Sequence, residues 1–137
     1  KVQGQVTSGA ASFSQHAAAV GLDSDMSPTV EMTRAFQKRR DLVIEQLKQI
    51  PGLIVNNPQG AFYVVPDVSF YFGKSDGTNT IQNADDFSEI MLAEAHVGLV
   101  SGSAFGADQC IRISYAASEE DLTEAIKRLK NCLSKFK

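Results

Sequence analysis

Residues 110–115 read Cys-Ile-Arg-Ile-Ser-Tyr, an apolar run that a single charged side chain, Arg112, interrupts. A loop of small residues, 101–106 (Ser-Gly-Ser-Ala-Phe-Gly), comes shortly before it. Alternation along an extended strand places the apolar side chains on one face and Arg112 and Ser114 on the other. The pattern therefore predicts a strand with one face in a core and an arginine on the opposite face.

Arg112 is the candidate binding residue of this strand. A guanidinium group is planar, always charged and carries its donors in a rigid fork, so it can hold a carboxylate through two hydrogen bonds. The alternative is an arginine on the open face of a sheet, solvated or paired with a surface acid. On these residues alone, both interpretations stay open.

The composition is that of one ordinary globular domain. The chain has 137 residues, of which 43% are hydrophobic and 21% are charged. A net charge of -3, with no basic block beyond residues 38–40, argues against a nucleic-acid surface and a polybasic membrane patch. No apolar run approaches the roughly 20 residues of a membrane helix. We expect a cytoplasmic protein with small-molecule or protein partners, and neither nucleic acid nor a membrane.

Cysteine and histidine usage gives no sign of a metal site. Cys110 and Cys132 fall in a predicted strand and a predicted helix without metal-ligand spacing, and His16 and His96 lie far apart in the sequence. We therefore expect reduced thiols and no metal.

Helices and strands follow one another along the chain without an internal repeat. Ser27-Pro28 and Ser118 are typical of helix starts, and Gly21 and Pro51-Gly52 of helix ends. The expected helices cover residues 10–22, 27–50, 85–95 and 118–133, and the expected strands cover residues 53–55, 60–65, 97–100 and 110–115. The first two strands would pair antiparallel, and the polar residues 71–83 would form a long surface loop.

This order of elements predicts an α/β fold class, an α+β layer in which a small, partly antiparallel mixed sheet packs against helices. The chain opens without a methionine, and the polar residues 1–8 lead directly into an alanine-rich segment. We therefore expect a piece of a longer protein.

Five segments together resemble the C-terminal part of a class I pyridoxal-phosphate-dependent aminotransferase, and most of all aspartate and prephenate aminotransferases. The segments are 3–8 (Gln-Gly-Gln-Val-Thr-Ser), 39–41 (Arg-Arg-Asp), 59–63 (Gln-Gly-Ala-Phe-Tyr), 100–106 (Val-Ser-Gly-Ser-Ala-Phe-Gly) and 111–116 (Ile-Arg-Ile-Ser-Tyr-Ala). The resemblance implies the small domain of the fold-type I enzymes. Residues 1–26 would be a remnant of the large, cofactor-binding domain, residues 27–52 a long linking helix, and residues 53–137 the small C-terminal domain.

The resemblance also implies substrate-binding and cofactor-binding residues. Arg112 would bind the α-carboxylate of the amino acid and of its 2-oxo-acid product. Gly60 would lie beside the substrate, where a side chain would obstruct closure; the alternative is a plain turn glycine. Thr7 and Ser8 would lie near the dimer interface, where residues can approach the cofactor phosphate of the partner subunit. Phe105 would pack near the domain boundary or in the core.

The implied activity is the transfer of an amino group between an amino acid, aspartate or glutamate, and a 2-oxo acid. The lysine that forms the Schiff base with pyridoxal 5'-phosphate would lie upstream, so we expect no catalytic residue and no bound cofactor in this chain, and no activity from it alone. The intact enzyme would be a homodimer. Two alternatives are a non-catalytic regulatory module that senses an amino acid through a lone arginine, and the effector sensor of a transcription regulator.

Overall fold

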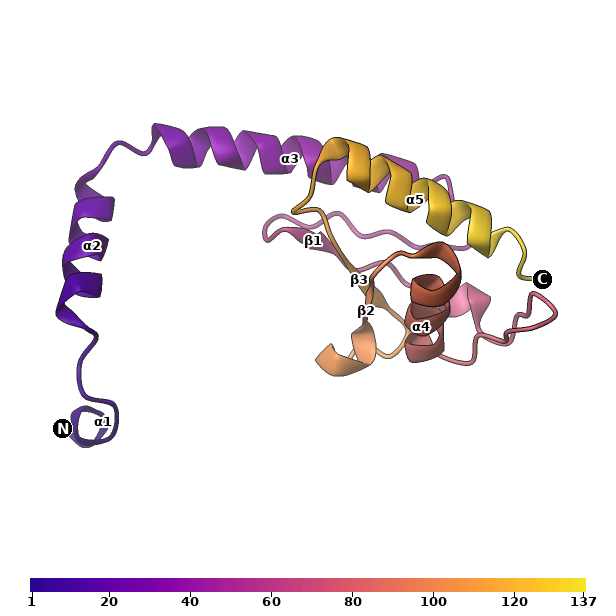
Figure 1. Cartoon of the computed structure of the whole chain (residues 1–137), viewed down its shortest axis with the longest axis horizontal. Coiled ribbons are helices and arrows are strands. Elements are labelled where there is room, and N and C mark those ends of the chain that lie inside the picture. The colour runs from indigo at the N-terminus through magenta and orange to yellow at the C-terminus, as the bar shows by residue number, and fades with distance from the viewer. The chain divides into compact units, whose positions relative to one another are not determined.

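The computed structural model describes residues 1–137, with the side chains of Gln3 and Thr7 excepted. It divides the chain into two compact units, Lys1–Thr33 and Arg34–Lys137. Figure 1 shows the order of the elements along the chain. Each unit is considered by itself below.

The first unit contains helices α1 (Val2–Thr7) and α2 (Ser12–Asp23) and the beginning of α3 (Ser27–Leu47). Every side chain that the structure describes in this unit is exposed. The exposed side chains include large apolar ones: Val2, Val6, Phe13, Val20, Leu22, Met26, Val30 and Met32. The unit therefore builds no core of its own.

Two helix boundaries in the first unit differ from the sequence prediction. Helix α2 does not end at Gly21 but continues to Asp23, since a glycine inside a helix costs only about 1 kcal/mol. Ser27 lies inside α3 instead of capping it, and the Asp25 carboxylate accepts hydrogen bonds from the Ser27 hydroxyl and from its backbone N–H (3.0 Å). These bonds lower the pKa of Asp25.

The second unit is a layer of helices on a small antiparallel sheet. The strands are β1 (Tyr63–Val64), β2 (Val100–Ser101) and β3 (Ile111–Ser114), and β3 lies in the centre. The register pairs Val64 with Ile113 on one side of β3 and Val100 with Arg112 on the other. The predicted α/β fold class is confirmed, and all three strands of this sheet are antiparallel.

Helix α5 (Glu119–Leu133) lies alongside the C-terminal half of α3 (Figure 1). Lys38 forms an ion pair with Glu119 at 2.9 Å, and Gln46 donates a hydrogen bond to Thr123 at 3.3 Å. Helix α4 (Ala84–Ala95) completes the layer, and 3-10 turns cover Ser69–Tyr71 and Gly102–Phe105.

One apolar core joins these elements. Helix α3 contributes only from its middle onward, because Val30 and Met32 are exposed and Phe36 is the first residue to pack against the core. Helices α4 and α5 each bury one apolar side against this core. The largest fully buried side chains are Tyr115, Phe87, Leu47, Ile50, Ile81, Met91, Ile111, Leu129, Val43, Val64 and Val68.

The expected pairing of residues 53–55 with 60–65 is shifted. Ile54 pairs with Asp67, and the Asn56 side chain accepts a hydrogen bond from the Val65 N–H at 3.0 Å. The predicted strand is also shorter, because Ala61 has a left-handed backbone, with φ at 64°. That conformation interrupts an extended strand, so β1 begins only at Tyr63.

The polar segment 71–83 contains a hydrogen-bonded hairpin. Gly73 N–H donates to Ile81 O at 2.7 Å, and Ile81 N–H donates to Lys74 O at 3.0 Å. Ser75 and Lys137 exchange two backbone hydrogen bonds, at 3.3 and 3.1 Å, so the hairpin is tied to the C-terminus.

Cys110 and Cys132 are free thiols. Burial raises the pKa of both. Among the described residues, no helix is long and apolar enough to cross a membrane.

Ser118 caps α5 as predicted, and the cap can be tested. Its hydroxyl oxygen accepts from the Asp121 N–H at 3.0 Å, and the hydroxyl donates to the Asp121 carboxylate at 2.7 Å. Replacing Ser118 by alanine is expected to destabilise the chain by about 1 kcal/mol in urea unfolding, because the first turn loses its acceptor. Ser134→Ala, at the C-terminal end of α5, is the control and is expected to lose less stability. Equal losses would contradict the capping role.

Gly102 closes the loop between β2 and β3, and no other residue fits there. A Cβ atom at this position would lie 2.1 Å from the Ala107 carbonyl oxygen and 2.5 Å from that of Cys110. Gly102→Ala is expected to destabilise the chain by about 2 kcal/mol, since the backbone has to shift. At Gly98 a Cβ would meet nothing within 4 Å, so Gly98→Ala should change stability by less than about 0.5 kcal/mol. Thermal unfolding of both variants measures the difference.

Candidate functional site

Arg112 lies on the central strand β3, on the face that points away from the core. Its neighbour Ile111 is fully buried, whereas Arg112 is half-buried. The guanidinium carbon lies 4.7 Å from the ring centroid of Phe105 and 5.4 Å from that of Tyr63. A cation over an aromatic face is attracted by the negative potential of the ring. Two aromatic rings thus hold the charged group in place.

The donors of this guanidinium are free for a ligand. Among the side chains that the structure describes, Arg112 has no ion pair and no hydrogen bond. By contrast, Arg40 is paired with Asp41 and Arg128 with Glu124. The aromatic contacts leave the in-plane N–H groups of Arg112 available, which is the geometry that a carboxylate requires.

A small cavity of about 160 Å³ opens beside the guanidinium. It is lined by Tyr63, Val65, Gly102, Phe105, Ala107 and Arg112. One cation among apolar walls suits a small anionic group better than a neutral one. The lining contains no lysine and no acid, so it does not fit pyridoxal phosphate, which needs an amine for its aldehyde and an acidic partner for its ring nitrogen.

The 3-10 turn Gly102–Phe105 positions Phe105 over Arg112, and α4 supports this turn. The Ser103 hydroxyl donates to the Asp85 carboxylate at 2.8 Å, and Ser101 Oγ lies 3.0 Å from Ser103 Oγ. Hydrogen bonds from Ser101 and Ser103 lower the pKa of Asp85. Asp85 lies in the first turn of α4, so the loop is fixed to a helix that packs against the core.

Sequence reasoning gave no role to Tyr63 or Asp85. The pairing of Tyr63 with Ser114 places its ring near Arg112, and this register cannot be read from composition or periodicity. For Asp85 the available signal was its place two residues after Asn83, a residue type that often caps helices.

Gly60 lies in the exposed segment that leads into β1. Its backbone is not left-handed, and a Cβ atom would meet nothing within 4 Å among the described residues. The left-handed residue of this turn is instead Ala61. The described residues therefore give no conformational or steric reason for a glycine at position 60.

Thr7 and Ser8 belong to the unit Lys1–Thr33. The side chain of Thr7 lies outside the described residues. Ser8 follows the last residue of α1 with φ at 56°. The structure thus brings Arg112, Tyr63 and Phe105 together, with Gly60 three residues before Tyr63, and describes Ser8 only within the other unit.

Comparisons with known proteins point to one family. A family model described as aminotransferase class I and II matches residues 1–129. A bifunctional aspartate aminotransferase and glutamate/aspartate-prephenate aminotransferase of Petunia hybrida is 43% identical over 141 residues, which cover 100% of this chain and 29% of that protein. A probable aspartate/prephenate aminotransferase of Aquifex aeolicus is 42% identical, over 96% of this chain and 32% of that protein.

Solved structures give the same result. The aspartate aminotransferase from Rhizobium meliloti has a TM-score of 0.91 at 40% identity, over 99% of this chain and 34% of that one. An aromatic aminotransferase from Pyrococcus horikoshii OT3 has a TM-score of 0.80 at 36% identity, over 97% of this chain and 34% of that one. The chain spans about a third of the length of the relatives that it matches. It belongs to the class I and II aminotransferase family.

Proposed function

We propose that this chain is the C-terminal part of an enzyme that transfers an amino group between an amino acid, aspartate or glutamate, and a 2-oxo acid. The observation that carries this proposal is Arg112, a half-buried guanidinium held by two aromatic rings and without a carboxylate partner among the described residues. The names of the similar proteins, aspartate and prephenate aminotransferases, support the reaction class and the substrate class.

Arg112 would bind the α-carboxylate, the group that the amino acid and the 2-oxo acid share. One arginine therefore serves both directions of the exchange, because the carboxylate is unchanged when the amino group is replaced by a carbonyl. The strand and the two rings fix the guanidinium before the substrate arrives. Binding then costs little side-chain entropy, and the bidentate geometry orients the Cα atom of the substrate.

The other parts of the chain follow from the same proposal. Residues 1–26 would belong to the large domain, residues 27–52 would link the domains, and residues 53–137 would form the small domain that closes over the substrate and excludes water. Gly60 would leave room for the substrate. Pyridoxal 5'-phosphate would be held mainly by residues outside this chain, with Thr7 and Ser8 near its phosphate. A cytoplasmic homodimer is the proposed assembly.

Removal of Arg112 in the full-length enzyme tests the assignment. Arg112→Ala is expected to raise KM for both the amino acid and the 2-oxo acid, which corresponds to a loss of about 2 to 5 kcal/mol of binding if the ion pair is desolvated. Arg128→Ala, which removes a surface arginine of α5 that is paired with Glu124, is the control. Steady-state kinetics with aspartate and 2-oxoglutarate measure both variants. An unchanged KM for every substrate would contradict the role of Arg112.

Measurements on the 137-residue chain alone distinguish between part of an enzyme and a regulatory module. Supplied with pyridoxal phosphate, aspartate and 2-oxoglutarate, it is expected to produce no oxaloacetate. In isothermal titration it is expected to bind neither aspartate nor glutamate. The reason is that its cavity contains only the arginine part of a substrate site. Binding of aspartate or glutamate by this chain would instead favour a non-catalytic amino-acid sensor.

A further inference from the structure

We propose that Arg40 and Tyr115 are positioning residues for the substrate site: they fix the segment 58–62, which carries Gly60 and leads into the ring of Tyr63 beside Arg112. The proposal rests on the proposed function, because it assumes that Arg112 and Gly60 face the substrate. Arg40 and Tyr115 belong to the segments 39–41 and 111–116, which resemble aminotransferases. Neither residue lines the cavity beside Arg112.

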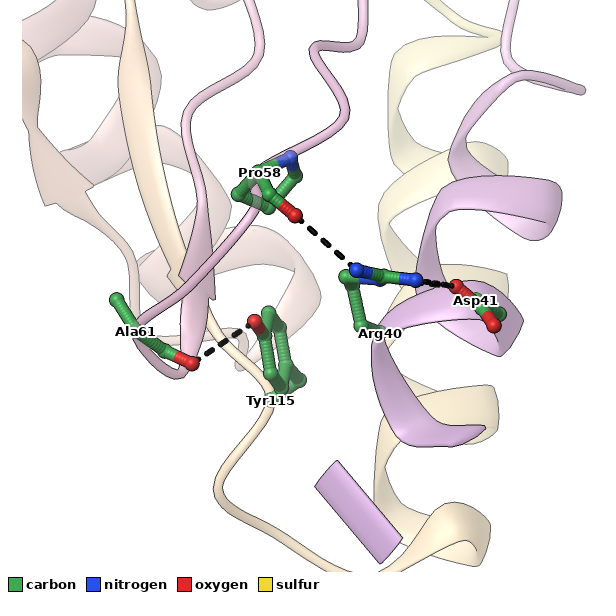
Figure 2. A network of polar contacts seen from close by, with 5 residues as sticks. All are labelled: Arg40, Asp41, Pro58, Ala61 and Tyr115. Carbon is green, nitrogen blue, oxygen red and sulfur yellow. Dashed lines mark hydrogen bonds and ion pairs between the residues drawn. The ribbon is translucent and has the colours of Figure 1, made fainter. Parts of the chain in front are cut away.

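Arg40 connects helix α3 to the beginning of this segment. Its Nη1 donates to the Pro58 carbonyl oxygen at 3.2 Å. Its Nε and Nη2 donate to the Asp41 carboxylate at 2.9 and 2.7 Å, which fixes the direction of the guanidinium. Figure 2 shows Arg40 between its two partners. Only 20% of the Arg40 side chain is exposed.

Tyr115 holds the other side of Gly60. Its hydroxyl donates to the Ala61 carbonyl oxygen at 3.1 Å (Figure 2). Its backbone N–H donates to the Phe62 carbonyl oxygen at 2.8 Å. The Tyr115 side chain is only 2% exposed, and its ring packs against Phe36 of α3. The bonds from Arg40 and Tyr115 therefore reach carbonyl groups on both sides of Gly60 from buried or half-buried positions.

The segment needs such support because its own contacts are few. Gln59, Gly60, Ala61 and Phe62 are all exposed. Ala61 is held in the left-handed region, with φ at 64°, which an alanine adopts only at a cost of about 1 to 2 kcal/mol. Without the hydrogen bonds from Arg40 and Tyr115, this strained backbone has little reason to keep its conformation.

The consequence reaches Arg112 through the strand pairing. Tyr63 directly follows the segment and pairs with Ser114, and the ring of Tyr63 lies over the Arg112 guanidinium. Arg112, Ser114 and Tyr115 lie within the same four residues, 112–115. These four residues therefore carry the carboxylate-binding group and also hold the segment 58–62. A shift of residues 58–62 would move both Gly60 and the aromatic wall of the site.

The test compares two buried tyrosines in the full-length enzyme. Tyr115→Phe removes the hydrogen bond to Ala61 and keeps the ring. Tyr71→Phe is the matched control, because Tyr71 is 4% exposed and its hydroxyl donates to the Pro51 carbonyl oxygen at 2.6 Å, in another part of the unit. Both variants should lose similar stability in urea unfolding. Only Tyr115→Phe is expected to lower kcat/KM, by about 3- to 10-fold and mainly through KM, the size of effect that one hydrogen bond allows.

A second variant keeps the proposal testable if Tyr115→Phe does not fold. Arg40→Gln removes the bond to Pro58 and is expected to lower kcat/KM by a similar factor, whereas Arg128→Gln is expected to leave it unchanged. This proposal would be overturned if the wild-type enzyme is active and both Arg40→Gln and Tyr115→Phe have a kcat/KM within twofold of the wild-type value. That result would leave the proposed function intact. Absence of aminotransferase activity in the wild-type enzyme would overturn the proposed function, and this proposal with it.

Discussion

Strand β3 has to bury Ile111 on one face while it presents Arg112 on the other, and the second unit is arranged around this alternation. The buried face joins helices α3, α4 and α5 through one apolar core. On the opposite face, Tyr63 and Phe105 lie against the guanidinium. A register shift of one residue would place the arginine in the core, where an unpaired charge is very costly. Stability of the fold and placement of the arginine are therefore the same requirement.

The two units differ in what they can do alone. Residues 34–137 contain the core, the sheet and the arginine, whereas every described side chain of residues 1–33 is exposed, large apolar ones among them. Apolar surface of this kind normally packs against something. The relatives are about three times as long as this chain, which supports our proposal that residues 1–26 belong to the large domain of the intact enzyme.

Much of the second unit could be predicted from local patterns. The inward faces of α4 and α5 follow from apolar periodicity, and Ser118 with Asp121 marks the start of α5. The resemblance of five short segments to aminotransferases led to the family. The pairing of Ile54 with Asp67, and the contacts of Arg40 with Pro58 and of Tyr115 with Ala61, could not be predicted. These depend on a left-handed alanine and on bonds between residues far apart in the sequence, and neither leaves a periodic signal.

The most direct measurement is a crystal structure of the full-length enzyme with an amino-acid substrate or its 2-oxo acid bound. We predict that both oxygens of the α-carboxylate accept hydrogen bonds from the Arg112 guanidinium at about 2.7 to 2.9 Å, with the rings of Tyr63 and Phe105 still in contact with it. A substrate carboxylate bound to another cation, with Arg112 left unpaired, would contradict the role assigned to this arginine.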